Sequence, residues 1–121
     1  MRYTYQLERD HYVDGYWKVR GQLEHQGHEL ALSRNSWASP EYKGVNTRWR
    51  TEEGQLFEVQ FHTPESFEAK QLTHEAYERL RSGTEPDAER PYLEAFQAEV
   101  CAALPIPDDV LSIPDYRKKE A

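Results

Sequence analysis

The chain has 121 residues, 37% of them apolar and 31% charged, with a formal net charge of −7. This is the length of one domain of about 100–150 residues, so a two-domain enzyme is excluded. The single cysteine excludes an internal disulfide framework, and the acidic balance argues against broad nucleic-acid binding through phosphate neutralisation. No apolar run approaches the ~20 residues of a membrane span, so we expect a cytoplasmic domain without a membrane partner.

The first third of the chain predicts a strand, a helix and a second strand. Residues 2–7 alternate between large apolar and polar side chains, with the period of two that is typical of strands. Asp14 is a suitable N-cap for a helix with apolar residues at helical spacing, and Gly27 is a suitable stop. Residues 28–37 alternate again and predict the second strand.

The middle of the chain predicts a β-hairpin. Residues 43–51 and 56–62 both alternate, and Glu52-Glu53-Gly54 between them forms a turn in which Gly54 is free to take a positive φ. One face of this hairpin is apolar and must face the core, through Val45, Trp49, Phe57, Val59 and Phe61.

Two helices and a tail are expected in the remainder. Thr63-Pro64-Glu65-Ser66 opens a helix that ends at Ser82-Gly83. A last helix over residues 88–104 carries one apolar stripe, formed by Tyr92, Leu93, Phe96, Val100 and Ala103. The order β-α-β-β-β-α-α predicts an α+β domain over residues 1–104, with a mixed, mostly antiparallel sheet of about four strands covered by helices. Residues 105–121 form a Pro-containing charged tail that we expect to be loosely held.

The second face of the hairpin is polar and allows two interpretations. It carries Asn46, Arg48, Arg50, Glu58, Gln60 and His62. A solvated face with cross-strand ion pairs, each contributing a few tenths of a kcal/mol, explains this composition. So does a site in which Arg48 and its neighbours bind phosphate oxygens and Glu58 serves as a base or metal ligand.

Other polar residues have simpler interpretations. Cys101 is expected to be a buried structural thiol, because no histidine is placed to activate it. Glu58, His62 and His74 together would allow a two-His, one-carboxylate metal site and hence a small hydrolase, although their spacing does not require one. The three tryptophans are expected in the core by default.

Several of these residues fall into a known pattern. Tyr42-Lys43-Gly44-Val45-Asn46, then Phe57-Glu58-Val59-Gln60-Phe61-His62-Thr63, and then Lys70 and His74 follow one another at fixed spacing. Over residues 2–81 this arrangement resembles the second half of a RelA/SpoT-type alarmone synthetase domain. That family transfers pyrophosphate from ATP to the 3′-hydroxyl of GDP or GTP.

The resemblance implies a role for each matching residue. Tyr42 would stack on the guanine of the acceptor nucleotide, and Glu58 would hold Mg²⁺ and deprotonate the acceptor hydroxyl. Asn46 and Gln60 would orient ribose or phosphate. His62 stands where the family usually has Arg and would face phosphate oxygens. Further positive charge would come from Lys43 and Lys70, and His74 would support the pocket from the helix.

The sequence also departs from the family pattern. The family has an Asp for Mg²⁺ near the start of its first strand, and neither Asp10 nor Asp14 is correctly placed for it; its upstream Arg/Lys-rich segment for the ATP phosphates has no counterpart here. We therefore expect a domain that binds a purine nucleotide, with Mg²⁺-dependent pyrophosphate transfer only if the N-terminal half is supplied. The alternative is a non-catalytic module of the same fold, for nucleotide sensing or for contact with a basic protein partner.

Overall fold

The computed structural model describes residues 1–83 and 89–119. These residues form the strands β1 (Arg2–Gln6), β2 (Glu29–Asn35), β3 (Val45–Arg50), β4 (Leu56–His62) and β5 (Tyr116–Arg117), and the helices α1 (Tyr12–His25), α2 (Pro64–Ser82) and α3 (Arg90–Ala102). The strands make one sheet in the order β1-β4-β3-β2-β5, in which β1 runs parallel to β4 and all other pairs are antiparallel. The predicted α+β class with a mixed, mostly antiparallel sheet is confirmed.

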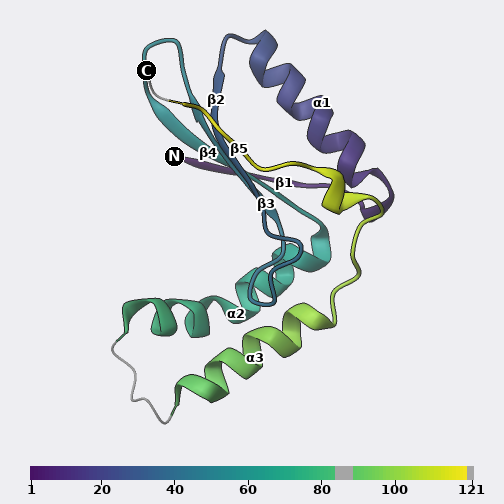
Figure 1. Ribbon diagram of the computed structural model, residues 1–121, viewed down its shortest axis with the longest axis vertical. Helices are drawn as coiled ribbons and strands as arrows, with labels where there is room; N and C mark the ends of the chain where they lie inside the picture. Colours follow the sequence, from purple (N-terminus) through teal and green to yellow (C-terminus); the bar gives the residue numbers. More distant parts are fainter. Residues whose placement is uncertain (84–88, 120–121) are drawn as a thin grey trace.

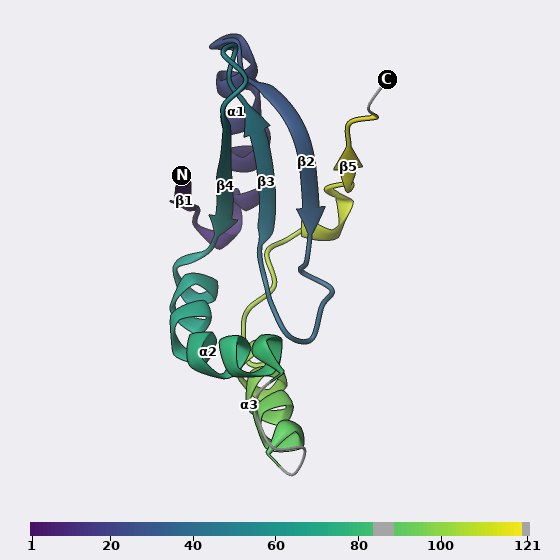
Figure 2. The ribbon, with the colours of Figure 1, turned by 90° about the vertical axis from the view of Figure 1, so that its left-hand side faces the viewer.

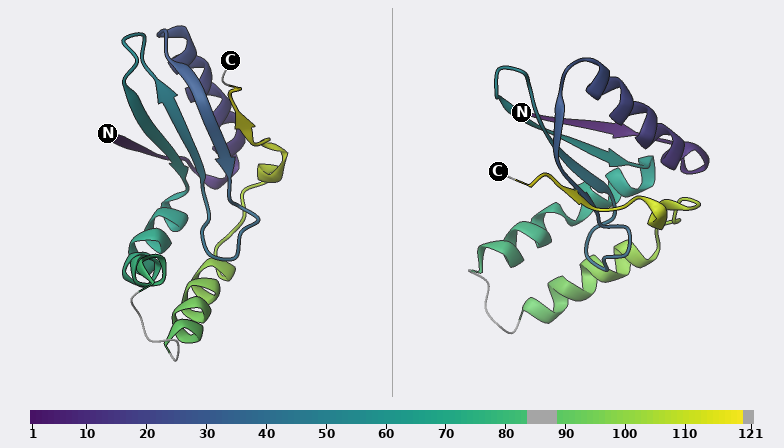
Figure 3. Two further views of the ribbon diagram at one scale, coloured as in Figure 1. Left: turned by 60° about the vertical axis from the view of Figure 1, so that its left-hand side comes forward. Right: turned by 45° about the horizontal axis from the view of Figure 1, so that its top comes forward.

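The helices are distributed unevenly around the sheet. Helix α1 covers one face, whereas α2 and α3 lie together beyond the end of the sheet at which β4 finishes (Figures 1 and 2). Both views of Figure 3 show α2 and α3 side by side. Across the described ranges, no helix combines the length and the apolar character that crossing a membrane requires. Among the described elements, no helix covers the sheet face opposite α1 over most of its length (Figure 2).

The core lies between α1 and the sheet. Tyr12 and Tyr16 of α1 are fully buried against the apolar face of the hairpin, including Trp49 and Phe61. Their hydroxyls do not remain unpaired, since Tyr12 Oη donates to the Phe61 carbonyl oxygen (2.5 Å) and Tyr16 Oη lies 2.7 Å from Ser33 Oγ. Aromatic rings are thereby buried in the core with their polar ends satisfied.

The hairpin matches its prediction closely. Its strands pair in the register that places Asn46 opposite Gln60 and Arg48 opposite Glu58, so the apolar and polar faces are those expected from the alternation. Gly54 takes φ 90° in the turn. Helix α2 begins as predicted, because Thr63 and Ser66 form a reciprocal capping box.

The tail is the main correction. The segment beyond residue 104 was expected to be loosely held, but Val110 and Ile113 are 1% and 2% exposed and belong to the core. Its β5 strand extends the sheet by pairing with β2, which is why five strands form where about four were predicted. Apolar burial and backbone pairing together hold this segment.

Two helical predictions also need correction. Helix α1 begins at Tyr12 after a 3₁₀ turn over Arg9–His11, so Asp14 lies in the first helical turn and is not the N-cap. Helix α3 begins at Arg90; the predicted start at residue 88 lies outside the described residues. The apolar stripe expected on α3 does not form its buried face: Tyr92 and Phe96 are 78% and 40% exposed, whereas Gln97 and Cys101 are buried.

Candidate functional site

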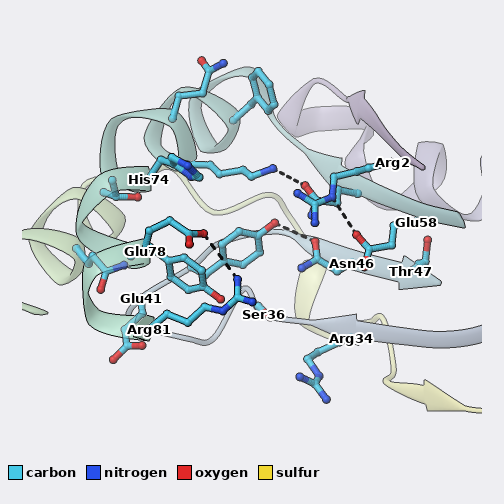
Figure 4. Close-up of a pocket in the computed structure, with 18 of the residues that line it drawn as sticks. Arg2, Arg34, Ser36, Glu41, Asn46, Thr47, Glu58, His74, Glu78 and Arg81 are labelled. Carbon is cyan, nitrogen blue, oxygen red and sulfur yellow. Dashed lines mark hydrogen bonds and ion pairs between the residues drawn. The ribbon is translucent and has the colours of Figure 1, made fainter. Parts of the chain in front are cut away.

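A cavity of about 590 Å³ lies between the polar face of the sheet and α2 (Figure 4). Among the predicted site residues, those that line it are Tyr42, Asn46, Arg48, Glu58, Gln60, Lys70 and His74. The structure thus gathers residues from the 36–44 segment, two strands and a helix around one space. Two predicted residues, Lys43 and His62, do not line it.

The sheet end of the cavity is dominated by guanidinium groups. Glu58 accepts from Arg2 Nε at 2.9 Å through Oε2, and its Oε1 lies 3.6 Å from Arg48 Nη2. Figure 4 shows the Arg2–Glu58 pair, and Arg34 on β2 also lines the cavity. Among the described lining residues, five Lys and Arg side chains face three carboxylates. In a chain with a net charge of −7, this cavity is therefore locally cationic and suited to an anion.

Lys70 extends this positive charge from α2. Its Nζ donates to Gln60 Oε1 at 2.7 Å. Burial and the nearby Arg2 lower the pKa of Lys70, because both disfavour another positive charge there. An anion in the cavity would relieve that repulsion.

The Tyr42 ring forms one wall of the cavity, and contacts of its hydroxyl group fix it in place. Its hydroxyl donates to Asn46 Oδ1 (2.9 Å) and lies 2.9 Å from His62 Nε2. Burial raises the pKa of Tyr42 to about 12, so its phenol stays neutral at pH 7. The ring is fixed without help from a ligand, as expected of a preorganised binding surface.

His62 supports Tyr42 and does not reach the cavity. It is fully buried, and its Nδ1 lies 2.9 Å from Ser66 Oγ. Because the Tyr42 hydroxyl donates to Asn46, it accepts from His62 Nε2–H, which assigns the neutral tautomer. Burial and, to a lesser degree, Lys70 lower the pKa of His62 to about 4. The expectation that His62 faces phosphate oxygens therefore does not hold.

Lys43, like His62, does not reach the cavity. Its Nζ donates to the Trp37 carbonyl oxygen at 2.8 Å, so it ties the segment ahead of β3 to the core. The charged ammonium group of Lys43 is therefore used in a structural contact.

Gly44 allows Tyr42 and His62 to approach each other. A Cβ at this position would lie 2.8 Å from His62 Cε1 and 3.2 Å from Tyr42 Cε1. The aromatic-X-Gly sequence 42–44 thus has a steric reason, since a side chain here would push the two rings apart.

We expect Gly44→Ala to lower the free energy of unfolding by about 1–2 kcal/mol through overpacking, as measured by urea denaturation. Gly21→Ala is the matched control, because a Cβ there meets nothing within 4 Å. In the interior of α1 it should raise stability by about 1 kcal/mol. Equal effects of the two substitutions would contradict the crowding argument.

The residues of the cavity do not fit a metal site on their own. The described ranges hold no group of three or more His, Cys, Asp or Glu side chains placed to bind a metal, so Glu58, His62 and His74 are not brought together. Glu58 is the carboxylate expected to hold Mg²⁺, yet both its oxygens already face guanidinium groups. Additional oxygen ligands from elsewhere would be needed.

Sequence reasoning missed several lining residues, among them Arg2, Arg34, Arg81 and Gln97. Arg2 carries a signal in its strand alternation, which puts it on the face opposite Tyr3. Only the parallel pairing of β1 with β4, with Arg2 opposite Glu58, shows that this face belongs to the site.

Comparison with solved structures identifies the class of fold. Small alarmone synthetase 2 from Bacillus subtilis matches at TM-score 0.52 and 15% identity, over 82% of this chain and 58% of that one. Small alarmone synthetase 1 from the same organism, bound to its product pppGpp, matches at TM-score 0.50 and 18% identity, over 84% and 54%. The protein smu.1046c from Streptococcus mutans UA159 matches at TM-score 0.51 and 18% identity, over 82% and 52%.

The chain therefore has the fold of part of a small alarmone synthetase. It spans slightly more than half the length of these structures, and this confirms the partial resemblance seen in the sequence. No family model matches the sequence, and no curated protein matches it either.

Proposed function

We propose that the cavity binds a purine nucleotide, with the base on Tyr42 and the phosphates among the guanidinium groups. The observation that carries this proposal is the fixed Tyr42 ring in the wall of a cationic cavity. An aromatic face suits a base and contributes about 1–3 kcal/mol per stacked base. The cavity volume of about 590 Å³ is in the usual range for small-molecule sites.

The spacing along β3 supports this orientation. Asn46, which holds the Tyr42 hydroxyl, lies two positions before Arg48, which faces Glu58. Two residues of a strand span about 7 Å, and both side chains lie on the same face. A nucleotide with its base on Tyr42 would extend its phosphates towards Arg48 and Arg2.

On their own, the residues of this cavity favour nucleotide binding over catalysis. Both carboxylate oxygens of Glu58 already face the guanidinium groups of Arg2 and Arg48, so a bound hydroxyl would have to displace one of these groups before Glu58 could accept its proton. Pyrophosphate transfer from ATP to a hydroxyl of the bound nucleotide remains the conditional extension of this proposal. It requires Mg²⁺ and an ATP site built with ligands beyond those in this cavity.

Calorimetric titration with GDP, GTP, ADP and ATP, with and without Mg²⁺, tests the proposal. We expect micromolar affinity for at least one purine nucleotide and a loss of about tenfold or more in Tyr42→Ala. Tyr92→Ala is the matched control, because Tyr92 is 78% exposed on α3 and does not line the cavity.

Absence of binding up to millimolar nucleotide would overturn the proposal. Equal losses in Tyr42→Ala and Tyr92→Ala would do the same. The fold would then serve another purpose, and a basic protein partner would be the next candidate for this acidic chain.

A further inference from the structure

Strand β1 is an edge strand without the usual protection against pairing with another chain. It stands at one end of the sheet order (Figure 3), and all five of its residues are exposed. Natural edge strands are commonly protected by proline, lysine, a bulge or a very short length. β1 contains neither proline nor lysine, and its register with β4 is uninterrupted. The opposite edge, β5, has only two residues and is followed by Lys118 and Lys119. β1 is therefore the edge to which a further strand can add.

The hydrogen bonds between β1 and β4 define which main-chain groups of β1 face outwards. The Met1 carbonyl oxygen accepts from an amide of β4, and the Leu7 amide donates to a carbonyl oxygen of β4 (2.7 Å). Successive residues of a strand direct their main-chain groups to opposite sides. The amides and carbonyl groups of Arg2, Thr4 and Gln6 therefore point away from β4, towards the open edge.

On the α1 face, β1 carries two exposed tyrosines. Tyr3 and Tyr5 are 49% and 40% exposed, although each already contacts a ring of β4. Tyr3 packs edge-on against Phe57, and Tyr5 stacks on Phe61, with ring centroids 6.1 Å and 5.8 Å apart. Each tyrosine ring is thus ordered on the sheet while much of its surface stays open. Exposed aromatic side chains beside a free strand edge are typical of a protein interface.

The order of residues in β1 fits a second copy of the same strand. In an antiparallel pair centred on Thr4, Thr4 lies opposite the partner's Thr4, and Arg2 lies opposite the partner's Gln6. These are the residues whose main-chain groups face outwards, so all of those groups form bonds in this register. Tyr3 lies opposite the partner's Tyr5 at a closer, non-hydrogen-bonded position, where aromatic pairs stabilise a sheet. No like charges lie opposite each other.

We propose that β1 is a homodimer interface, at which two copies of this chain pair antiparallel about Thr4 and form one continuous sheet. The pair has two-fold symmetry, the commonest symmetry of homo-oligomers. Because Arg2 lines the cavity and lies opposite the partner's Gln6, each copy adds a side chain beside the cavity of the other. One short strand from each copy buries little surface, so we expect a dissociation constant of about 1–100 µM. The interface goes beyond the proposed function and does not depend on it.

Sedimentation equilibrium of the full chain, at micromolar to near-millimolar concentrations, tests the interface. We expect a monomer–dimer equilibrium that Thr4→Pro weakens about tenfold or more, because it removes the central outward-facing amide at a position where an edge strand tolerates proline. Thr4→Lys should have the same effect by placing two ammonium groups opposite each other. Gln22→Lys is the charge-matched control, because it adds the same group at an exposed position on α1. If circular dichroism shows that Thr4→Pro does not fold, Thr4→Lys, which keeps every main-chain amide, decides the question.

The register is tested by a disulfide across the two-fold axis. Opposite residues at hydrogen-bonded positions have Cα atoms about 5.5 Å apart, which is within the reach of a disulfide, and the native Cys101 is buried. Mild oxidation of Thr4→Cys should therefore give a covalent dimer. Gln6→Cys should not, because the two copies of that residue are about 13 Å apart along the paired strands.

Three results would overturn the proposal. A chain that remains monomeric at near-millimolar concentration does not pair with itself, and a strand from a different protein would then be the candidate for this edge. A dimer that persists equally in Thr4→Pro and Thr4→Lys uses another surface. Absence of the Thr4→Cys cross-link in a chain that dimerises would contradict antiparallel pairing about Thr4.

Discussion

Replacing Ile113 by Ala will lower the free energy of unfolding by about 2–5 kcal/mol, the usual cost of emptying an aliphatic core position. Ile113 is 2% exposed and packs in the core with Val110. The backbone around it is also fixed, since Asn35 Nδ2 donates to the carbonyl oxygens of Val110 (2.9 Å) and Ile113 (3.0 Å). Urea denaturation followed by circular dichroism measures the change.

Leu111 provides the control within the same segment. It is 65% exposed, so Leu111→Ala should change stability by no more than about 0.5 kcal/mol. If Ile113→Ala is as stable as wild type, the segment after α3 does not unfold together with the rest of the domain, and its place in the core would have to be revised.

Lowering the pH from 7 to 5 will remove about 2 kcal/mol of stability through His62 alone. The pKa of His62 is lowered from 6.5 to about 4 in the folded protein, by burial and then by Lys70. In the unfolded chain the ring takes up a proton as the pH falls below about 6.5, whereas the folded protein does not until about pH 4. The His62 contribution is thus complete above pH 7 and is lost as the pH falls towards 4.

Urea denaturation at pH 5, 6 and 7 measures this dependence. His62→Gln should have a shallower pH dependence than wild type, because the titrating group is removed. His25→Gln, at an exposed position at the end of α1, should retain the full slope. Parallel curves for wild type and His62→Gln would show that another group is responsible.

The sequence correctly predicts those parts of the molecule in which the local alternation of apolar and polar residues matches the alternation of buried and exposed side chains. The hairpin is such a part, because alternation defines both the strands and their two faces, and hence the approach of Arg48 to Glu58. Asn46 and Gln60 are predicted in the same way, because the hairpin register places them opposite each other. Tyr42 lies before the hairpin, and only the family resemblance points to it.

The remaining features depend on contacts between distant segments. β5 has only two residues and is stabilised by its pairing with β2, so no periodicity reveals it. Arg2 joins the site through the parallel pairing of β1 with β4. On α3 the buried face includes a glutamine in place of the expected aromatic stripe, because this helix packs against α2 and not against the core between α1 and the sheet.

The parallel pairing of β1 has a practical consequence for handling the protein. The Met1 carbonyl oxygen accepts from the Glu58 backbone amide at 2.9 Å, and Arg2 lines the cavity. An affinity tag fused to the amino terminus would therefore begin at the rim of the candidate site and compete with any titrant. β5 lies at the opposite edge of the sheet, so a carboxyl-terminal tag is the better choice for every binding measurement described above.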